Sequence, residues 1–154
     1  MAIQVLNQWD KAWADVKIGS TNLPLKRWGC TITSLSMASQ WYNEYTTPPE
    51  IAGHKDWFTY KVPNVEDGQI IWSKLRFKNF RFLKRFYKFD PADLDAALKN
   101  PRDTVLIEIN NHSHWVLGLR KLGFGLYLIA DPNGGKKRII KSSQINGLAI
   151  FTRS

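Results

Sequence analysis

The first half of the chain is patterned as helix around its one cysteine. From residue 31 to residue 42, apolar residues recur three or four positions apart, which is the spacing that places side chains on one face of a helix. These residues are Ile32, Leu35, Ala38 and Tyr42. The spacing predicts a helix over 31–42, and Cys30 then lies at the start of that helix.

Other helix signals in this half are shorter. Thr46-Thr47-Pro48-Pro49-Glu50 interrupts the helical pattern, and we predict a short helix after Pro49 and another near 69–75. Asp90 followed by Pro91 is a typical helix start, because aspartate caps free backbone N–H groups and proline is tolerated at the first helical position. This pair predicts a helix over 91–100.

Beyond residue 100 the pattern changes from helix to strand. Five short runs are rich in branched and aromatic residues, and Asn-Asn, Gly-Phe-Gly and Pro-Asn-Gly-Gly turns lie between them. The runs are 104–109, 114–119, 126–130, 137–140 and 148–152. We predict an antiparallel sheet, and helices followed by strands are the order of an α+β domain with two halves packed on each other.

Length and composition indicate one globular domain spanning residues 1–154. The chain has 154 residues, 44% of them hydrophobic and 13% aromatic, which is enough for one well-packed core and too short for two ordinary domains. The aromatic residues are spread over most of the chain, which argues against disorder. We find no internal repeat and expect a monomer.

Charge and the N-terminal segment bear on partners and location. The formal net charge of +9 implies attraction to polyanions, namely nucleic acid, anionic lipid or anionic cell-wall polymers. The N-terminal segment carries Asp10 and lacks a basic region followed by a long apolar run, so it does not read as a signal peptide. No stretch approaches the ~20 apolar residues of a membrane span. We expect synthesis in the cytoplasm without a signal peptide, and release by another route before any action on a cell wall.

Three residues of the pattern can act together chemically. A thiol at a helix start, such as that of Cys30, is favoured as thiolate by the helix dipole. A lone cysteine is also often a buried apolar residue, so its position alone leaves both interpretations open. His114 begins one apolar run and Asp131 ends the next, and a hairpin between them brings both to its open end. His114 alone would fit a histidine at a strand end without a chemical task, and Asp131 alone would fit an ordinary turn. Together with Cys30, a histidine and a carboxylate in these positions form the arrangement that activates a thiol.

The same segments resemble a known family. Trp28-Gly29-Cys30-Thr31-Ile32-Thr33-Ser34-Leu35-Ser36-Met37, His114-Trp115-Val116 and Ala130-Asp131-Pro132 are similar to papain-like cysteine peptidases related to the double-glycine (bacteriocin-leader) processing domains. The upstream segment Gln8-Trp9-Asp10-Lys11-Ala12-Trp13 resembles the one that carries the oxyanion-hole glutamine in stand-alone relatives. The elements occur in the family's order and span most of the chain.

This resemblance implies a papain-like fold and a role for each matched residue. Cys30 would attack a peptide carbonyl, His114 would shuttle the proton, and Asp131 would orient the imidazole. Gln8 would supply an oxyanion-hole donor together with the backbone N–H of Cys30, with Gln4 as the reserve candidate because the spacing from Gln8 to Cys30 is long for the family. The residues matched beside these would contact substrate: Trp28, Gly29 and Trp115.

One position departs from the family and one stretch is not explained by it. Thr31 stands where relatives often have glycine. The stretch 74–88 interleaves basic and aromatic residues without an acid. Three interpretations stay open for it: a half-buried segment with a cationic solvent face, a surface that adheres to anionic polymers, or a single-stranded nucleic-acid site.

The sequence therefore predicts a cysteine peptidase that works without a metal or organic cofactor. His54 and His112 do not form a metal-ligating pattern with Cys30. Peptidoglycan peptides are the favoured substrate, as for a phage-type lytic endopeptidase, and a leader peptide is the alternative. Two rival classes remain, a non-catalytic papain-like binding domain and a nucleic-acid-binding protein.

Overall fold

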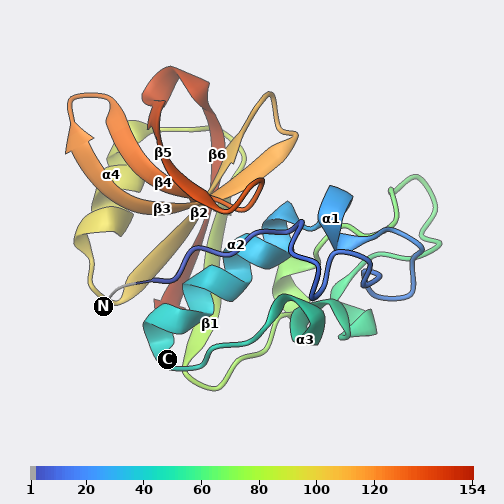
Figure 1. Ribbon diagram of the computed structural model, residues 1–154. Helices are drawn as coiled ribbons and strands as arrows, with labels where there is room; N and C mark the ends of the chain where they lie inside the picture. The colour runs from blue at the N-terminus through green and yellow to red at the C-terminus, as the bar shows by residue number, and fades with distance from the viewer. Residues whose placement is uncertain (1–2) are drawn as a thin grey trace.

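Six strands form one antiparallel sheet in the computed structural model, which describes residues 3–154 (Figure 1). Their order across the sheet is β1-β6-β2-β3-β4-β5. The strands are β1 (Phe80–Phe86), β2 (Asp103–Ile109), β3 (His114–Gly123), β4 (Leu126–Asp131), β5 (Lys136–Lys141) and β6 (Ile145–Arg153). Five of them confirm the predicted runs and the antiparallel sheet, while β3 and β6 extend further than predicted.

Strand β1 was not predicted, and it lies inside the basic and aromatic stretch 74–88. Its only partner among the described strands is β6, so it forms one edge of the sheet. The pairing shifts between Phe82 and Lys84, which breaks the alternation that would reveal a strand in the sequence. Phe80 is buried, whereas Arg81 and Lys84 are exposed. Exposed basic side chains on an edge strand discourage pairing with another chain.

The helices lie mostly before the sheet in the chain. They are α1 (Leu25–Trp28), α2 (Cys30–Ser39), α3 (Pro48–Ala52) and α4 (Pro91–Lys99), with short 3-10 turns η1 (Gln40–Tyr42), η2 (Lys55–Trp57), η3 (Trp72–Lys74) and η4 (Ser142–Gln144). The helix predicted over 31–42 is confirmed as α2 followed by η1, and α3 confirms the short helix near Pro49. Near 69–75 the structure has only the turn η3.

Caps observed at two helix starts explain where these helices begin. In α4 the carboxylate of Asp90 accepts a hydrogen bond from the N–H of Ala92 at 2.9 Å, and Pro91 is the first helical residue, as predicted. In α3 the side chains and backbone groups of Thr47 and Glu50 bond reciprocally in a capping box.

Helix α2 and helix α4 cover opposite faces of the sheet (Figure 1). Leu35, Met37 and Ala38 of α2 share a core with Leu106 and Phe151 of the sheet, among other residues. Helix α4 contributes to a second core, which contains Leu94, Ala97, Val105, Ile107 and Val116. The predicted α+β arrangement of two packed halves is confirmed at this level.

Helix α2 is buried nearly all round, which fixes its position more firmly than one apolar face would. Every residue from Ile32 to Ser39 is buried, including four with hydroxyl groups. The hydroxyls of Ser36 and Ser39 donate to carbonyl oxygens of Thr46 and Ser36 at 2.6 Å each, so burial does not leave them unpaired. A helix held in this way places its first residue, Cys30, with little freedom. None of the helices within residues 3–154 has the length and apolar character needed to cross a bilayer.

Candidate active site

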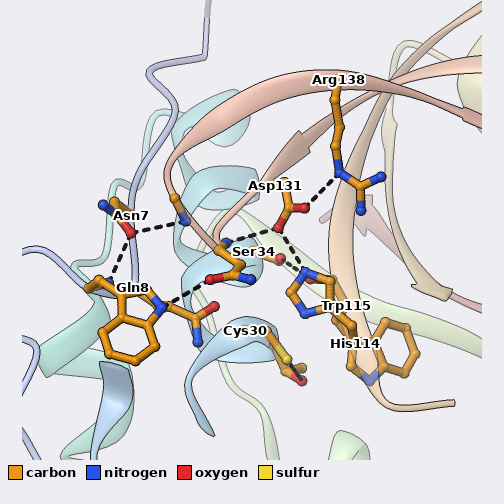
Figure 2. A network of polar contacts seen from close by, with 12 residues as sticks. Asn7, Gln8, Cys30, Ser34, His114, Trp115, Asp131 and Arg138 are labelled. Atoms are coloured by element: carbon orange, nitrogen blue, oxygen red, sulfur yellow. Dashed lines mark hydrogen bonds and ion pairs between the residues drawn. The ribbon is translucent and has the colours of Figure 1, made fainter. Parts of the chain in front are cut away.

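Cys30 and His114 face each other from the first residues of α2 and β3 (Figure 2). The two side chains point toward one another, and the imidazole lowers the pKa of the thiol. The hydroxyl of Ser34, one turn after Cys30, donates to the carbonyl oxygen of Trp115 at 3.3 Å and ties the helix to the strand. The sequence placed these two residues together, and the structure does so as well.

Asp131 stands on the other side of the imidazole. Its Oδ1 atom lies 2.7 Å from Nε2 of His114, so Nδ1 is the ring nitrogen left for the thiol. The hairpin of β3 and β4 produces this contact, because Leu117 pairs with Ala130 and the open end then brings His114 to Asp131. Asp131 is almost fully buried, at 4% exposure.

Both carboxylate oxygens of Asp131 are held. Oδ1 also accepts the backbone N–H of Asn133 at 2.9 Å, and Oδ2 accepts Nε–H of Arg138 at 2.8 Å (Figure 2). Arg138 was missed at the sequence level. The hairpin of β4 and β5 contained the signal, since Arg138 pairs with Ile129, two positions from Asp131, and alternate residues of a strand share a face.

The charges of the three residues stabilise one another. Burial alone raises the pKa of the Cys30 thiol, but its hydrogen bond to His114 and the charge of His114 outweigh this and lower that pKa. Burial lowers the pKa of His114, while hydrogen bonds to Asp131 and Cys30 raise it to about 9. Burial raises the pKa of Asp131, and the hydrogen bonds from His114 and Arg138 lower it to about 2. All three directions favour the charged forms, which are thiolate, imidazolium and carboxylate.

Gln8 is attached to both sides of the site. Its side-chain Nε2 donates to the carbonyl oxygen of Lys26 at 3.0 Å, and Lys26 belongs to α1, which leads directly to Cys30. Its backbone N–H donates to the carbonyl oxygen of Pro132 at 2.9 Å, next to Asp131. The side chain is buried, and Oε1 has no hydrogen-bond partner among residues 3–154.

Gln4 is placed elsewhere. Its backbone N–H donates to Oε1 of Gln40 at 3.0 Å, and its carbonyl oxygen accepts from Nε2 of Gln40 at 2.9 Å. Gln40 follows the C-terminal end of α2, the end opposite Cys30. Of the two glutamines, only Gln8 therefore lies at the start of the helix.

A second polar network, which the sequence did not reveal, joins the N-terminal segment to the turn after Asp131. Oδ1 of Asn7 accepts the N–H groups of Trp9 at 3.0 Å and Gly134 at 3.2 Å, and the indole N–H of Trp9 donates to Asn133 at 3.0 Å. Gly135 fits because a Cβ there would lie 2.7 Å from Cβ of Asn7. The network holds Gln8 and Asp131 in one assembly (Figure 2).

A cleft of about 1190 Å³ opens beside Cys30. It lies between the start of α2, the loop 58–73 and residues of β1, β2 and β3. Trp28 and Trp115 line it, and their contact with a substrate stays a prediction. Thr31 lines it too, with its hydroxyl oxygen 4.0 Å from Sγ of Cys30, so both residues belong to the cleft wall.

Gly29 lies at the junction between α1 and α2. It is buried and does not line the cleft. A Cβ at this position would lie 2.6 Å from the carbonyl oxygen of Leu25, so glycine allows α2 to begin immediately after α1. The residue shapes the junction that presents Cys30, and its contact with a substrate stays a prediction.

The stretch 74–88 divides between the interior and the surface. The rings of Phe77 and Phe80 stack with centroids 4.2 Å apart, and Phe82 packs on Trp72 and Phe151. These rings are therefore not free to stack on nucleic-acid bases. Arg85 points inward, where its NH2 lies 3.0 Å from Glu108, while most other basic residues of the stretch are exposed.

Comparison with known proteins gives no relative for this chain. No protein-family model matches it, and neither a curated protein nor a solved structure is significantly similar. Within residues 3–154, no group of three or more His, Cys, Asp or Glu side chains is arranged to hold a metal ion.

Proposed function

We propose that this protein is a cysteine peptidase of papain-like architecture, with Cys30 as nucleophile. The observation that carries the proposal is the continuous contact from the thiol through His114 to the doubly held carboxylate of Asp131 at the edge of a cleft. A structural cysteine needs neither a histidine partner nor a carboxylate behind that histidine. Nucleophilic catalysis by a thiol needs both.

The proposed reaction begins with attack by the Cys30 thiolate on a peptide carbonyl carbon. The carbonyl π electrons move to oxygen, and the oxyanion is stabilised by the backbone N–H of Cys30, which has no intrahelical acceptor at a helix start, and by the second Nε2–H of Gln8. The C–N bond then breaks as Nδ1–H of His114 gives its proton to the leaving amine. An acyl-enzyme thioester remains.

Hydrolysis completes the cycle. His114, now neutral, takes a proton from water, the resulting hydroxide adds to the thioester carbonyl, and the C–S bond breaks to release the acid and the thiolate. Asp131 keeps its charge throughout and stabilises the imidazolium each time it forms. All groups in this proposed cycle come from the chain itself.

For the substrate we propose peptides of peptidoglycan, with leader peptides as the alternative. The exposed basic residues of 74–88 support the first, because they suit an anionic wall. A nucleic-acid function has less support, since Phe77, Phe80 and Phe82 of that stretch are packed against other rings of the protein, although Tyr87 is exposed. A non-catalytic binding domain has less support too, because binding alone does not require a cysteine, a histidine and a carboxylate that shift one another's pKa values.

Cleavage assays test this function. The protein is incubated with purified peptidoglycan and, separately, with a mixed peptide library, and products are identified by mass spectrometry. We expect cleavage by the wild type and none by Cys30→Ala. Gln8→Ala should lower kcat by about 10² to 10³, which is the usual cost of losing one oxyanion-hole donor.

Gln4→Ala is the matched control and should retain wild-type turnover, because Gln4 bonds at the far end of α2. Equal turnover by wild type and a folded Cys30→Ala variant would refute the peptidase.

A further inference from the structure

The cleft beside Cys30 is acidic in a strongly basic protein. The chain has 22 Lys and Arg residues against 13 Asp and Glu. Among residues 3–154, three carboxylates nevertheless line the cleft, Glu66, Asp67 and Glu108, against one arginine, Arg85, and one histidine, His112. Within residues 3–154 no lysine lines it. The sign of the charge is thus reversed where a substrate would lie.

Glu108 is the buried member of this set. It lies on β2 opposite Trp115, the residue after His114, and its side chain is only 7% exposed. Its Oε1 atom lies 3.0 Å from NH2 of Arg85 and 2.9 Å from Nδ1 of His112. Both bonds end on Oε1, so Oε2 accepts no hydrogen bond from any residue in the described part of the chain. One oxygen of this largely buried side chain is therefore left for a donor that enters the cleft.

Arg85 is not free to bind an anion there. Besides Glu108, its guanidinium donates to the carbonyl oxygens of Phe86 and Leu148. It also lies over two rings, 4.2 Å from the centroid of Tyr87 and 4.7 Å from that of Trp115. Its interactions fix Glu108 in place and offset part of one negative charge.

The other two carboxylates are not offset. Glu66 and Asp67 lie exposed on the loop across the cleft, and neither forms an ion pair with a residue of 3–154. Asp67 accepts only the backbone N–H of Lys61, at 2.8 Å. The cleft therefore carries an unbalanced negative charge, which attracts cations and repels carboxylates.

We infer that the cleft selects peptides that carry a primary ammonium or guanidinium group close to the cleaved bond, with Glu108 as the buried acceptor and Glu66 and Asp67 as the attracting rim. The nearby ring of Trp72, which also lines the cleft, offers a further face for a cation. The inference rests on the proposed function for the reaction, but the charge selectivity concerns binding and can be measured without turnover.

The test uses sets of peptides that differ at one position only, with lysine, arginine, N-acetyl-lysine or glutamate there, and with that position moved along the sequence. Binding is measured by fluorescence anisotropy on Cys30→Ala, and cleavage on the wild type. In the best position, lysine or arginine should improve binding and kcat/KM about tenfold over N-acetyl-lysine and more over glutamate. The preference should shrink as salt is added.

Variants then locate the preference. Glu66→Gln should reduce the ratio of lysine to N-acetyl-lysine roughly threefold, as expected for one exposed charge pair. The matched control Asp93→Asn removes an equal charge from α4, on the opposite face of the sheet from α2, and should leave the ratio unchanged. Glu108→Gln should reduce it further, and circular dichroism checks that this variant is folded.

The outcomes separate the two proposals. Lysine-selective binding without cleavage by the wild type supports the acidic subsite and refutes the peptidase. Cleavage without any preference for a cation refutes the subsite and leaves the peptidase standing. If no peptide is bound or cleaved, both proposals fail.

Discussion

At the scale of single residues, the orientation of His114 depends on how firmly Asp131 is held. A carboxylate with one bonded oxygen can rotate and present either oxygen to the ring. Here Oδ1 is hydrogen-bonded to Nε2 of His114 and to the N–H of Asn133, while Oδ2 accepts a hydrogen bond from Nε–H of Arg138. Arg138 therefore acts as a positioning residue for Asp131, which in turn orients the imidazole.

Replacing this guanidinium tests its role. In Arg138→Met we expect kcat to fall about tenfold with little change in KM, because the imidazole is less well oriented while the cleft is untouched. Arg138→Lys should recover part of the loss, since its ammonium can reach Oδ2 but not with the same geometry. Steady-state kinetics on one peptide measures both.

Arg120→Met, which removes an exposed arginine of β3, is the control and should behave as wild type. Unchanged kcat in Arg138→Met would mean that His114 and Asn133 alone fix the carboxylate.

Residue by residue, the sequence anticipated the centre of the site better than its surroundings. Cys30, His114 and Asp131 could be grouped because helix starts and hairpin ends are local features that bring known positions together. The pair of Arg85 and Glu108 joins β1 to β2, which are not neighbours in the sheet, and no local rule relates them. The motif also could not reveal the close packing of Gly29 against Leu25, because a motif does not distinguish contact with substrate from packing.

At the scale of elements, α2 and β1 show opposite results. The apolar spacing predicted α2. It could not predict that the face carrying the hydroxyl groups is buried as well, because this burial depends on the segments packed around the helix. Strand β1 was missed because its bulge and basic residues hide the alternation of Phe80 and Phe82. Tertiary pairing with β6 decided its conformation.

The basic residues of β1 divide into two kinds, and charge reversal should separate them. Arg81→Glu with Lys84→Glu changes exposed side chains, so it should weaken adhesion to anionic polymers while leaving stability and small-peptide cleavage nearly intact. Arg85→Glu places a second carboxylate beside buried Glu108 and should cost about 3–5 kcal/mol of unfolding free energy.

Chemical denaturation, peptide cleavage and sedimentation with an anionic polymer measure the three effects. Two results would contradict this division of the strand: loss of peptide turnover in the folded double variant, or an Arg85→Glu protein as stable as wild type.

At the scale of the whole molecule, the helical half carries Cys30, and the sheet carries His114 and Asp131, which are the proposed base and its carboxylate. The N-terminal segment crosses between them, since Gln8 bonds to Lys26 on one side and Pro132 on the other. The order of helices before strands predicted this division into halves. It could not predict the cleft between them, because the cleft is shaped by the loop 58–73, which has little regular structure.

In the proposed peptidase Cys30 and His114 form an ion pair. The pH range of this pair follows from the pKa shifts of the two residues. The pKa of Cys30 is lowered on folding, so its thiolate is present above that pKa and is lost on acidification. The pKa of His114 is raised to about 9, so its positive charge is present below this value and is lost as the pH rises through it. The ion pair exists between the two.

The most direct measurement is the rate at which iodoacetamide alkylates folded Cys30 as a function of pH, in wild type, His114→Ala and His112→Ala. The wild type should react quickly near neutral pH and slow down on acidification, because thiolate is the nucleophile. His114→Ala should move the midpoint of the curve of alkylation rate against pH to higher pH by about one unit or more. His112→Ala should leave this midpoint in place. A thiol that reacts only after denaturation, or one midpoint shared by all three proteins, would contradict the account.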